Sequence, residues 1–281
     1  MGDHFAAFSF VDRITELEPA VRARGRFAVP ADVANFPSCL VAEAVGQLAA
    51  WVAMAHIGYR GRPVAALAHE TRFIRDVNPG DVLELEVEID SCDDEAVVYR
   101  GWAEVGGARV IELNHCLGPM LPVVEFDSPE ELAARFELLC GMGAAPGRFH
   151  GIAAPRVVAQ PINGNSATAA LYVPERAPFF NDHFPRRPVF PATLLLNEQI
   201  ALAMTLAGES PHWPRGAALS PLRMTNVKVR AFTPPGQVLE IGAELSAPAG
   251  NTAVAALSAR AEGKMVATSR VEIGPRAGSE K

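Results

Sequence analysis

Cysteine is scarce in this sequence of 281 residues, and its spacing follows no recognisable pattern. The four cysteines, Cys39, Cys92, Cys116 and Cys140, include no pair separated by two residues. Zinc ribbons and disulfide-stapled domains depend on regularly spaced cysteines. We therefore expect free thiols, with neither a zinc ribbon nor a disulfide framework.

Positive charge is also in short supply. Lysine and arginine number 25 and aspartate and glutamate 32, so the net charge is 25 − 32 = −7. A protein surface that holds phosphate backbones needs a basic excess. Nucleic acid is therefore not expected among the partners of this chain.

The sequence lacks a targeting signal and a long apolar run. Its start has no basic segment followed by apolar residues, and Ala6 occupies a position where N-myristoylation requires Ser or Thr. The longest apolar stretch, residues 40–54, is interrupted by Glu43 and Gln47 and is too short to span a bilayer. We expect a cytoplasmic protein with no membrane partner.

What the sequence does contain is a weak internal repeat. Residues 36–40 (FPSCL) and residues 190–194 (FPATL), 154 positions later, each open an apolar run. Residues 79–85 (PGDVLEL) are echoed 156 positions later by residues 235–241 (PGQVLEI). Two anchors at nearly the same offset favour duplication of one unit.

Both halves predict the same elements. Residues 40–55 and 194–207 are rich in Ala and Leu and apolar on nearly every face, which predicts two enclosed helices. Alternating apolar residues predict strands after each helix, at 82–89, 97–105, 108–113, 238–245, 252–261 and 264–273. A single enclosed helix among antiparallel strands is an α+β arrangement.

A further helix and a linker separate the halves. Ser128, Pro129 and Glu131 stand at the N-cap, N1 and N3 positions of a predicted helix that runs to about Cys140. The small residues 141–147 follow it. We place the domain boundary there, with residues 1–147 as the N-terminal unit and residues 148–281 as the C-terminal unit.

Glu43 is the first candidate for chemistry. It lies among apolar neighbours in the first predicted helix, and a carboxylate is rarely buried unless it is paired or functional. Cys39, Glu43 and Gln47 recur every four residues and form one polar stripe, which a solvent-facing helix edge would also explain. At the same offset the second helix has no carboxylate, because its residues are Thr193, Asn197 and Ala201.

His183 is the second candidate. It stands in residues 178–191 (PFFNDHFPRRPVFP), hereafter the His loop, which leads into the second predicted helix. Prolines restrict the backbone, so this loop can hold an imidazole in a fixed direction. A lone loop histidine is nevertheless more often structural than catalytic. The first half has only a shorter segment at this place, without a histidine.

Three segments resemble the β-hydroxyacyl-ACP dehydratases, the FabA/FabZ family of hot-dog proteins. Residues 183–191 (HFPRRPVFP) resemble that family's His-Phe-Pro-x-x-Pro-Val-x-Pro signature. Residues 37–48 (PSCLVAEAVGQL) are similar to the helix segment that follows it, and residues 8–14 (FSFVDRI) to the first strand. The resemblance implies a double hot-dog fold: two tandem hot-dog units, each an antiparallel sheet wrapped around a central helix, forming a pseudo-dimer.

The same resemblance implies one composite active site. In that family each site takes its histidine from one subunit and its acid from the other. Here the second half has the His loop but Asn197 at the acid position, and the first half has Glu43 without a His loop. Glu198, one residue further on, should point away, since one residue turns a helix by about 100°.

The implied reaction is the dehydration of a 3-hydroxyacyl thioester to a 2-enoyl thioester, a lyase activity. His183 suits the base, because a near-neutral imidazole is largely unprotonated at pH 7, and Glu43 suits the acid in its protonated form, which burial favours. No metal or organic cofactor is expected. Ser38 and Cys39 stand at the start of the first helix, and their amides, above all that of Cys39, would bind the oxyanion. Gln47 would lie beside the acid and Phe184 in the acyl tunnel. The resemblance also implies that the Val189 carbonyl would hold the His183 ring.

The expected partner is an acyl carrier protein or CoA thioester, carried on phosphopantetheine. Phe179, Phe180 and Trp51 are further candidates for the tunnel wall, with core packing as the alternative. Five basic residues could form a patch for an acidic carrier, or could be scattered solubilising charge: Arg186, Arg187, Arg223, Lys228 and Arg230. A homodimer is a further expectation, since exposed sheet edges often pair.

Two other functions remain open. A hot-dog thioesterase would use Glu43 to activate water and would not need a histidine facing it. A non-catalytic acyl-binding subunit would bind the carrier without turnover. The acyl chain length and the pathway, fatty-acid or polyketide synthesis, are not predicted.

Overall fold

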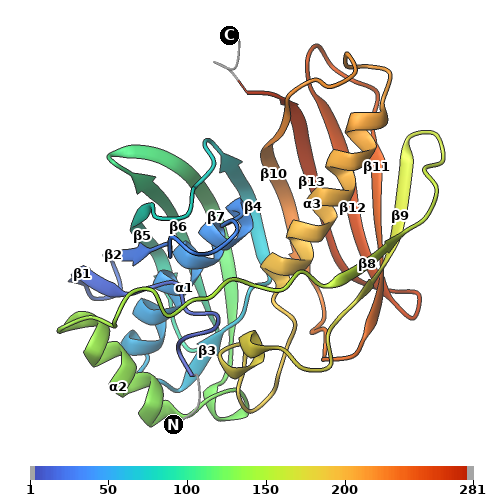
Figure 1. Ribbon diagram of the computed structural model, residues 1–281. Coiled ribbons are helices and arrows are strands. Elements are labelled where there is room, and N and C mark those ends of the chain that lie inside the picture. The colour runs from blue at the N-terminus through green and yellow to red at the C-terminus, as the bar shows by residue number, and fades with distance from the viewer. Residues whose placement is uncertain (1–3, 277–281) are drawn as a thin grey trace.

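The computed structural model describes residues 4–276, which form two similar units (Figure 1). The N-terminal unit contains helix α1 (Ser38–His56) and the strands β1 (Arg13–Glu18), β2 (Arg22–Ala28), β3 (Gly61–Pro63), β4 (Leu67–Phe73), β5 (Val82–Cys92), β6 (Ala96–Val105) and β7 (Ala108–Pro122). The C-terminal unit contains helix α3 (Ala192–Glu209) and the strands β8 (Arg156–Ala159), β9 (Ser166–Tyr172), β10 (Leu219–Val229), β11 (Val238–Leu245), β12 (Ala253–Ala261) and β13 (Lys264–Pro275). The other helices are η1 (Val123–Glu125), α2 (Pro129–Cys140) and η2 (Pro178–Asn181).

One antiparallel sheet runs through both units. Its order is β1-β2-β5-β6-β7-β4-β10-β13-β12-β11-β9-β8, with β3 paired to β7. The units join where β4 pairs with β10, from Arg72 opposite Arg223 to Leu67 opposite Lys228. Read outward from this junction, the two halves have the same order of strands. This mirrored order confirms the duplication predicted from the repeat.

Each unit wraps its half of the sheet around one central helix (Figure 1). Helices α1 and α3 begin at Ser38 and Ala192, the same offset of 154 residues that separates the sequence motifs. By length and composition α1 could cross a membrane, but 61% of that stretch is buried inside the protein, as in the core helix of a folded domain. The predicted α+β double hot-dog fold is confirmed.

The linker begins with the predicted helix. The Ser128 hydroxyl accepts a hydrogen bond from the Glu131 amide at 3.3 Å and so caps α2, which ends at Cys140 as expected. Residues 141–155 then lead to β8. The domain boundary near residue 147 falls in this segment and stays a prediction. All four cysteines lie within residues 4–276 and are free thiols, as predicted.

Candidate active site

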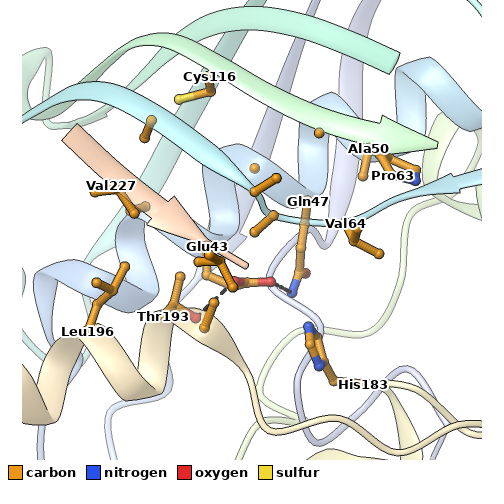
Figure 2. Close-up of a pocket in the computed structure, with 18 of the residues that line it drawn as sticks. Glu43, Gln47, Ala50, Pro63, Val64, Cys116, His183, Thr193, Leu196 and Val227 are labelled. Atoms are coloured by element: carbon orange, nitrogen blue, oxygen red, sulfur yellow. Dashed lines mark hydrogen bonds between the residues drawn. The ribbon is translucent and has the colours of Figure 1, made fainter. Parts of the chain in front are cut away.

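A cavity of about 220 Å³ contains both candidate catalytic side chains (Figure 2). Its wall comes from both units, mainly from α1, β4, β7, the His loop, the start of α3 and β10. The predicted residues that line it are Cys39, Glu43, Gln47, Trp51, His183, Phe184 and Val189. Among the residues that the structure describes, the wall does not include Ser38, Phe179, Phe180 or Glu198. Phe179 and Phe180 instead pack in the hydrophobic core.

Glu43 projects from α1 into this cavity, and both of its carboxyl oxygens accept hydrogen bonds (Figure 2). Gln47 Nε2 donates to Oε1 at 3.0 Å, and Thr193 Oγ1 donates to Oε2 at 2.9 Å. Gln47 comes from the next turn of α1, whereas Thr193 comes from the first turn of α3. The carboxyl group is therefore held by both units and faces an internal cavity, not a solvent-facing helix edge.

Gln47 is fixed in turn by the N-terminal segment. Its Oε1 accepts a hydrogen bond from the Phe10 amide at 2.8 Å, and its Nε2 also donates to the Phe8 carbonyl at 2.9 Å. These two bonds settle which end of the side-chain amide carries the oxygen. Gln47 and Glu43 of the polar stripe are thus a connected pair of groups with assigned donors and acceptors.

His183 faces the same cavity from the His loop. Its Nδ1 lies 2.9 Å from the Val189 carbonyl oxygen, the contact implied by the family resemblance. A carbonyl only accepts, so Nδ1 carries the hydrogen and Nε2 keeps its lone pair. The Val189 amide donates back to the His183 carbonyl at 3.0 Å, which closes the loop around the ring. Figure 2 shows the ring directed toward Glu43 and Gln47.

Electrostatics keeps this imidazole neutral. Burial lowers the pKa of His183 below its ordinary value, and the nearby Arg62 guanidinium acts in the same direction. The charge of Glu43 and the hydrogen bond to Val189 oppose the shift without reversing it. A neutral ring with a free Nε2 can accept a proton at pH 7.

The cavity extends along α1 because the facing residues of that helix are small. Ala42, Gly46 and Ala50 line it at successive four-residue intervals. A Cβ atom on Gly46 would lie 3.2 Å from Tyr99 Oη, so a larger residue at this position would narrow the cavity. At the same offset α3 carries larger residues, namely Leu196, Ile200 and Met204.

The mirrored position in the C-terminal unit has no comparable site. Asn197 stands where α1 has Glu43, and its Nδ2 donates to Glu198 Oε1 at 3.2 Å, outside the cavity. Cys39 is the counterpart of Thr193 in the repeat. Its thiol is buried, and burial together with the charge of Glu198 raises its pKa to about 12. The charge of Glu198 thus acts on Cys39 at the start of α1, and Glu198 lies outside the cavity that His183 lines.

Two of the five basic residues are paired with acidic residues of this chain. Arg187 pairs with Glu125 at 3.1 Å, and Arg223 pairs with Glu70 at 3.2 Å. Val227 and Val229 of β10 line the cavity. Because side chains alternate along a strand, Lys228 and Arg230 lie on the opposite, outer face. The salt bridges favour scattered surface charge over a single docking patch.

The mirrored sheet, with Glu43 of one unit and His183 of the other lining one cavity, defines a double hot-dog protein. Family models match both units: the FabA-like domain over residues 4–114, and the ApeI dehydratase (ApeI-like) over residues 159–270. The chain belongs to the 3-hydroxyacyl-[acyl-carrier-protein] dehydratases of the FabA/FabZ type, a family of lyases.

Curated relatives carry the same assignment. FabZ 3-hydroxyacyl-[acyl-carrier-protein] dehydratase of Clostridium acetobutylicum is 34% identical over 113 residues, covering 36% of this chain and 80% of the relative. FabZ of Bacillus subtilis is 36% identical over 128 residues, covering 41% of this chain and 91% of the relative. Each match spans most of the relative and less than half of this chain, as duplication of a FabZ-sized unit predicts.

Solved structures share the two-unit fold. An oleoyl thioesterase of Lactobacillus plantarum has a TM-score of 0.59 at 10% identity, over 90% of this chain and 96% of that one. The tesB protein of Mycobacterium avium subspecies paratuberculosis has a TM-score of 0.57 at 15% identity, over 93% and 95% of the two chains. A MaoC-like dehydratase has a TM-score of 0.52 at 13% identity, over 95% of this chain and 98% of that one. At these identities the likeness shows the fold alone.

Proposed function

We propose that this chain removes water from a 3-hydroxyacyl thioester to give a 2-enoyl thioester, with His183 as base and Glu43 as acid. The observation that carries the proposal is the placement of both groups in one cavity, each held by other protein groups. β-Elimination from a thioester needs a base at the α-carbon and an acid at the β-hydroxyl. One small acyl group between these side chains would meet both.

His183 takes the α-proton in this mechanism. Its Nε2 is the free acceptor, because Nδ1–H is engaged by the Val189 carbonyl. That carbonyl also stabilises the imidazolium formed when the proton arrives, since it lies against the donor side of the ring. A buried neutral imidazole of lowered pKa is available as a base over the whole neutral range.

Glu43 gives a proton to the leaving hydroxyl, and water departs. The donors Thr193 Oγ1 and Gln47 Nε2 stay in place during this step and stabilise the carboxylate that forms. The reaction therefore ends with an imidazolium and a carboxylate facing each other across the product. Transfer of a proton from one to the other restores the starting state.

Backbone amides at the start of α3 are the best placed donors for the thioester oxygen. The first amides of a helix have no intrahelical acceptor. The amides of Leu194 and Leu195 donate to the Pro191 carbonyl at 3.1 Å each, and the preceding residues Ala192 and Thr193 line the cavity. Because Thr193 Oγ1 bonds Glu43 directly, the first turn of α3 supports this role better than the Cys39 amide expected from the sequence, although Cys39 also lines the cavity.

The acyl chain would lie along the small residues Ala42, Gly46 and Ala50 of α1, where Leu196 and Val227 of the other unit complete an apolar wall. The relatives are named for acyl-carrier-protein substrates, and we extend this to an ACP or CoA thioester here. Fatty-acid or polyketide synthesis, a cytoplasmic location and a homodimer formed through the free sheet edges β1 or β8 belong to the same proposal.

Hydration of a crotonyl thioester, the reverse reaction, tests the proposal. With the wild-type protein, the absorbance of the enoyl thioester should fall as hydration proceeds. His183→Ala and Glu43→Gln should each lower the rate of hydration by about 10²–10⁴-fold. Thiol release, measured in parallel, separates dehydratase from thioesterase chemistry. Wild-type rates in both variants, or thiol release without hydration, would rule the proposed function out.

A further inference from the structure

Residues 4–10, which we call the N-terminal strap, connect the supports of the two catalytic groups. Phe8 and Phe10 of the strap bond Gln47, which in turn holds Glu43. The Phe5 and Phe8 amides of the strap donate to Asp182, the residue immediately before His183. The strap is therefore a direct link between the acid in one unit and the base in the other.

Asp182 is the anchor of the strap on the His loop. Its Oδ2 accepts hydrogen bonds from the Phe8 amide at 2.7 Å and from the Ser9 hydroxyl at 3.2 Å, and its Oδ1 accepts one from the Phe5 amide. The residue is 5% exposed, so these protein donors replace its hydration. A buried carboxylate with this set of donors holds the strap in one register.

His4 closes the strap with a positive charge. Its Nδ1 lies 2.9 Å from the Asn181 carbonyl oxygen and 3.3 Å from Asp182 Oδ1, and its Nε2 lies 3.3 Å from Asp127 Oδ1. Both ring nitrogens thus face groups that only accept, and only the imidazolium has a hydrogen on each nitrogen. Burial lowers the pKa of His4, but the bonds and charges of Asp127 and Asp182 outweigh it and raise the pKa to about 9.

Charged groups on the neighbouring elements complete this cluster. Glu131 of α2 lies 3.9 Å from His4 Nε2, and Arg62 of β3 lies 3.1 Å from Asp127 Oδ2. The Arg135 guanidinium, also from α2, lies over the Phe5 ring, with its Cζ atom 5.0 Å from the ring centroid. His4, Asp127 and Glu131 have the ligand types of a metal site. Because Arg62 already contacts Asp127, we assign the cluster to charge pairing within the protein.

We infer that the imidazolium of His4, bound between Asp127 and Asp182, locks the N-terminal strap over the His loop and thereby sets the position of His183 relative to Glu43. His4 and Asp182 are positioning residues for the reaction under "Proposed function", on which this inference rests. The lock is pH-sensitive. Its contribution is complete below pH 6.5, the ordinary pKa of histidine, and is lost as the pH rises through about 9.

Hydrogen exchange combined with kinetics tests the lock on the full chain. The variants are His4→Gln and Asp182→Asn, and His212→Gln is the matched control, because His212 is exposed in the loop after α3. The first readout is protection of the Phe5 and Phe8 amides at pH 7 and 9.5, corrected for intrinsic exchange. In the wild type and the control, the protection factors of these amides should be about tenfold or more lower at pH 9.5 than at pH 7. His4→Gln should have low protection at both values.

The second readout is the kcat and KM of dehydration. At pH 7 both variants should lose about tenfold in kcat with a smaller change in KM, and His4→Gln should lack the wild-type decline near pH 9. If Asp182→Asn does not fold, Ser9→Ala removes one bond to Asp182 and should give the same effect in weaker form. Wild-type protection in His4→Gln would overturn the lock, and lost protection with unchanged kcat would overturn its positioning role. A wild type with pH-dependent protection but no turnover would refute the dehydratase and support the lock.

Discussion

The two central helices start from the same design and differ at the positions that matter for chemistry. α1 carries Glu43 and leaves a cavity beside Gly46, whereas α3 has Asn197 and Ile200 at the same offset. The loop before α3 holds His183, whereas the shorter segment before α1 ends at Phe36. The Phe36 ring packs edge-on against the ring of Phe149 in the linker, with 5.9 Å between the ring centroids. One mirrored position opens into the cavity, whereas the other, with Asn197 and Glu198, does not line it.

This difference shows how duplication within one chain frees the two units to specialise. In a symmetric pair of identical units, every change in the acid, the base or the pocket appears twice. Under the proposed mechanism, the N-terminal unit of this chain supplies the acid and the acyl space, and the C-terminal unit supplies the base and the helix start with Thr193. One complete site then forms even though neither unit has both the acid and the base.

The largest expected contrast is between two glutamates on the two helices. Glu43→Gln should lower the rate of dehydration by about 10²–10⁴-fold, because an amide cannot give the proton that the leaving hydroxyl needs. Glu198→Gln should change it by less than about twofold, because Glu198 lies outside the cavity. Steady-state kinetics of the purified variants measures both. Equal losses would remove the distinction between the two positions.

Thr193 allows a smaller test of the contact between the units. Thr193→Val removes the hydrogen bond that Oγ1 donates to Glu43 at 2.9 Å, and kcat should fall by about tenfold, because a bond to a charged group contributes about 1.5–3 kcal/mol. Thr205→Val is the matched control in the same helix, since its hydroxyl donates to the Ala201 carbonyl. A similar kcat in the two variants would contradict the role of Thr193.

Gly46 tests whether the acyl chain follows α1. Gly46→Ala places a methyl group 3.2 Å from Tyr99 Oη and should lower kcat/KM for longer acyl thioesters by about tenfold, with a smaller loss for crotonyl substrates. Gly208→Ala in α3 has open space around the added atom and is the control. Rates measured over a series of chain lengths give the result. An equal loss of kcat/KM at every acyl length would contradict an acyl chain that lies along α1.

The pH profile should reveal a base with a lowered pKa. His183 must be neutral to accept the α-proton, and burial lowers its pKa, so the acid limb of kcat/KM should lie below pH 6.5, the ordinary value for histidine. As the pH falls through that lowered pKa, activity should be lost. An acid limb above pH 6.5 in wild type would contradict a buried neutral base.

The smallest expected effect is that of restoring the missing acid. Asn197→Glu gives α3 a carboxylate at the mirrored position, but the segment before α1 that corresponds to the His loop contains no histidine, so the rate should stay within about twofold of wild type. The same assay measures it. A clear gain in rate would mean that the mirrored position keeps a base of its own.

Much of the fold could be predicted from the sequence, because the two helices and the long strands repeat. The edge elements were harder. Strands β1 and β2 each carry three charged residues and β8 has only four residues, so none of them shows the apolar alternation that predicts a strand. Strands β3, β4, β9 and β10 are also not predicted from the sequence, and in β10 the alternation is interrupted by Pro221.

The site could be predicted in part for a similar reason. Glu43, Gln47 and His183 stand out locally, as a polar stripe and as a motif. Contacts between the units leave no mark on local pattern, which is why the bond from Thr193 to Glu43 was not predicted. The repeat contained a usable signal, since Thr193 opens α3 at the offset of Cys39. For the strap, the acid at Asp182 beside the motif histidine was the available signal.

The account depends on one acyl group lying between an imidazole and a carboxyl from different units. A crystal structure with a non-hydrolysable 3-hydroxyacyl thioester analogue tests this most directly. The account predicts the α-carbon within about 3.5 Å of His183 Nε2 and the 3-hydroxyl within hydrogen-bond distance of the Glu43 carboxyl. An analogue bound with either group out of reach of the reacting atoms would contradict it.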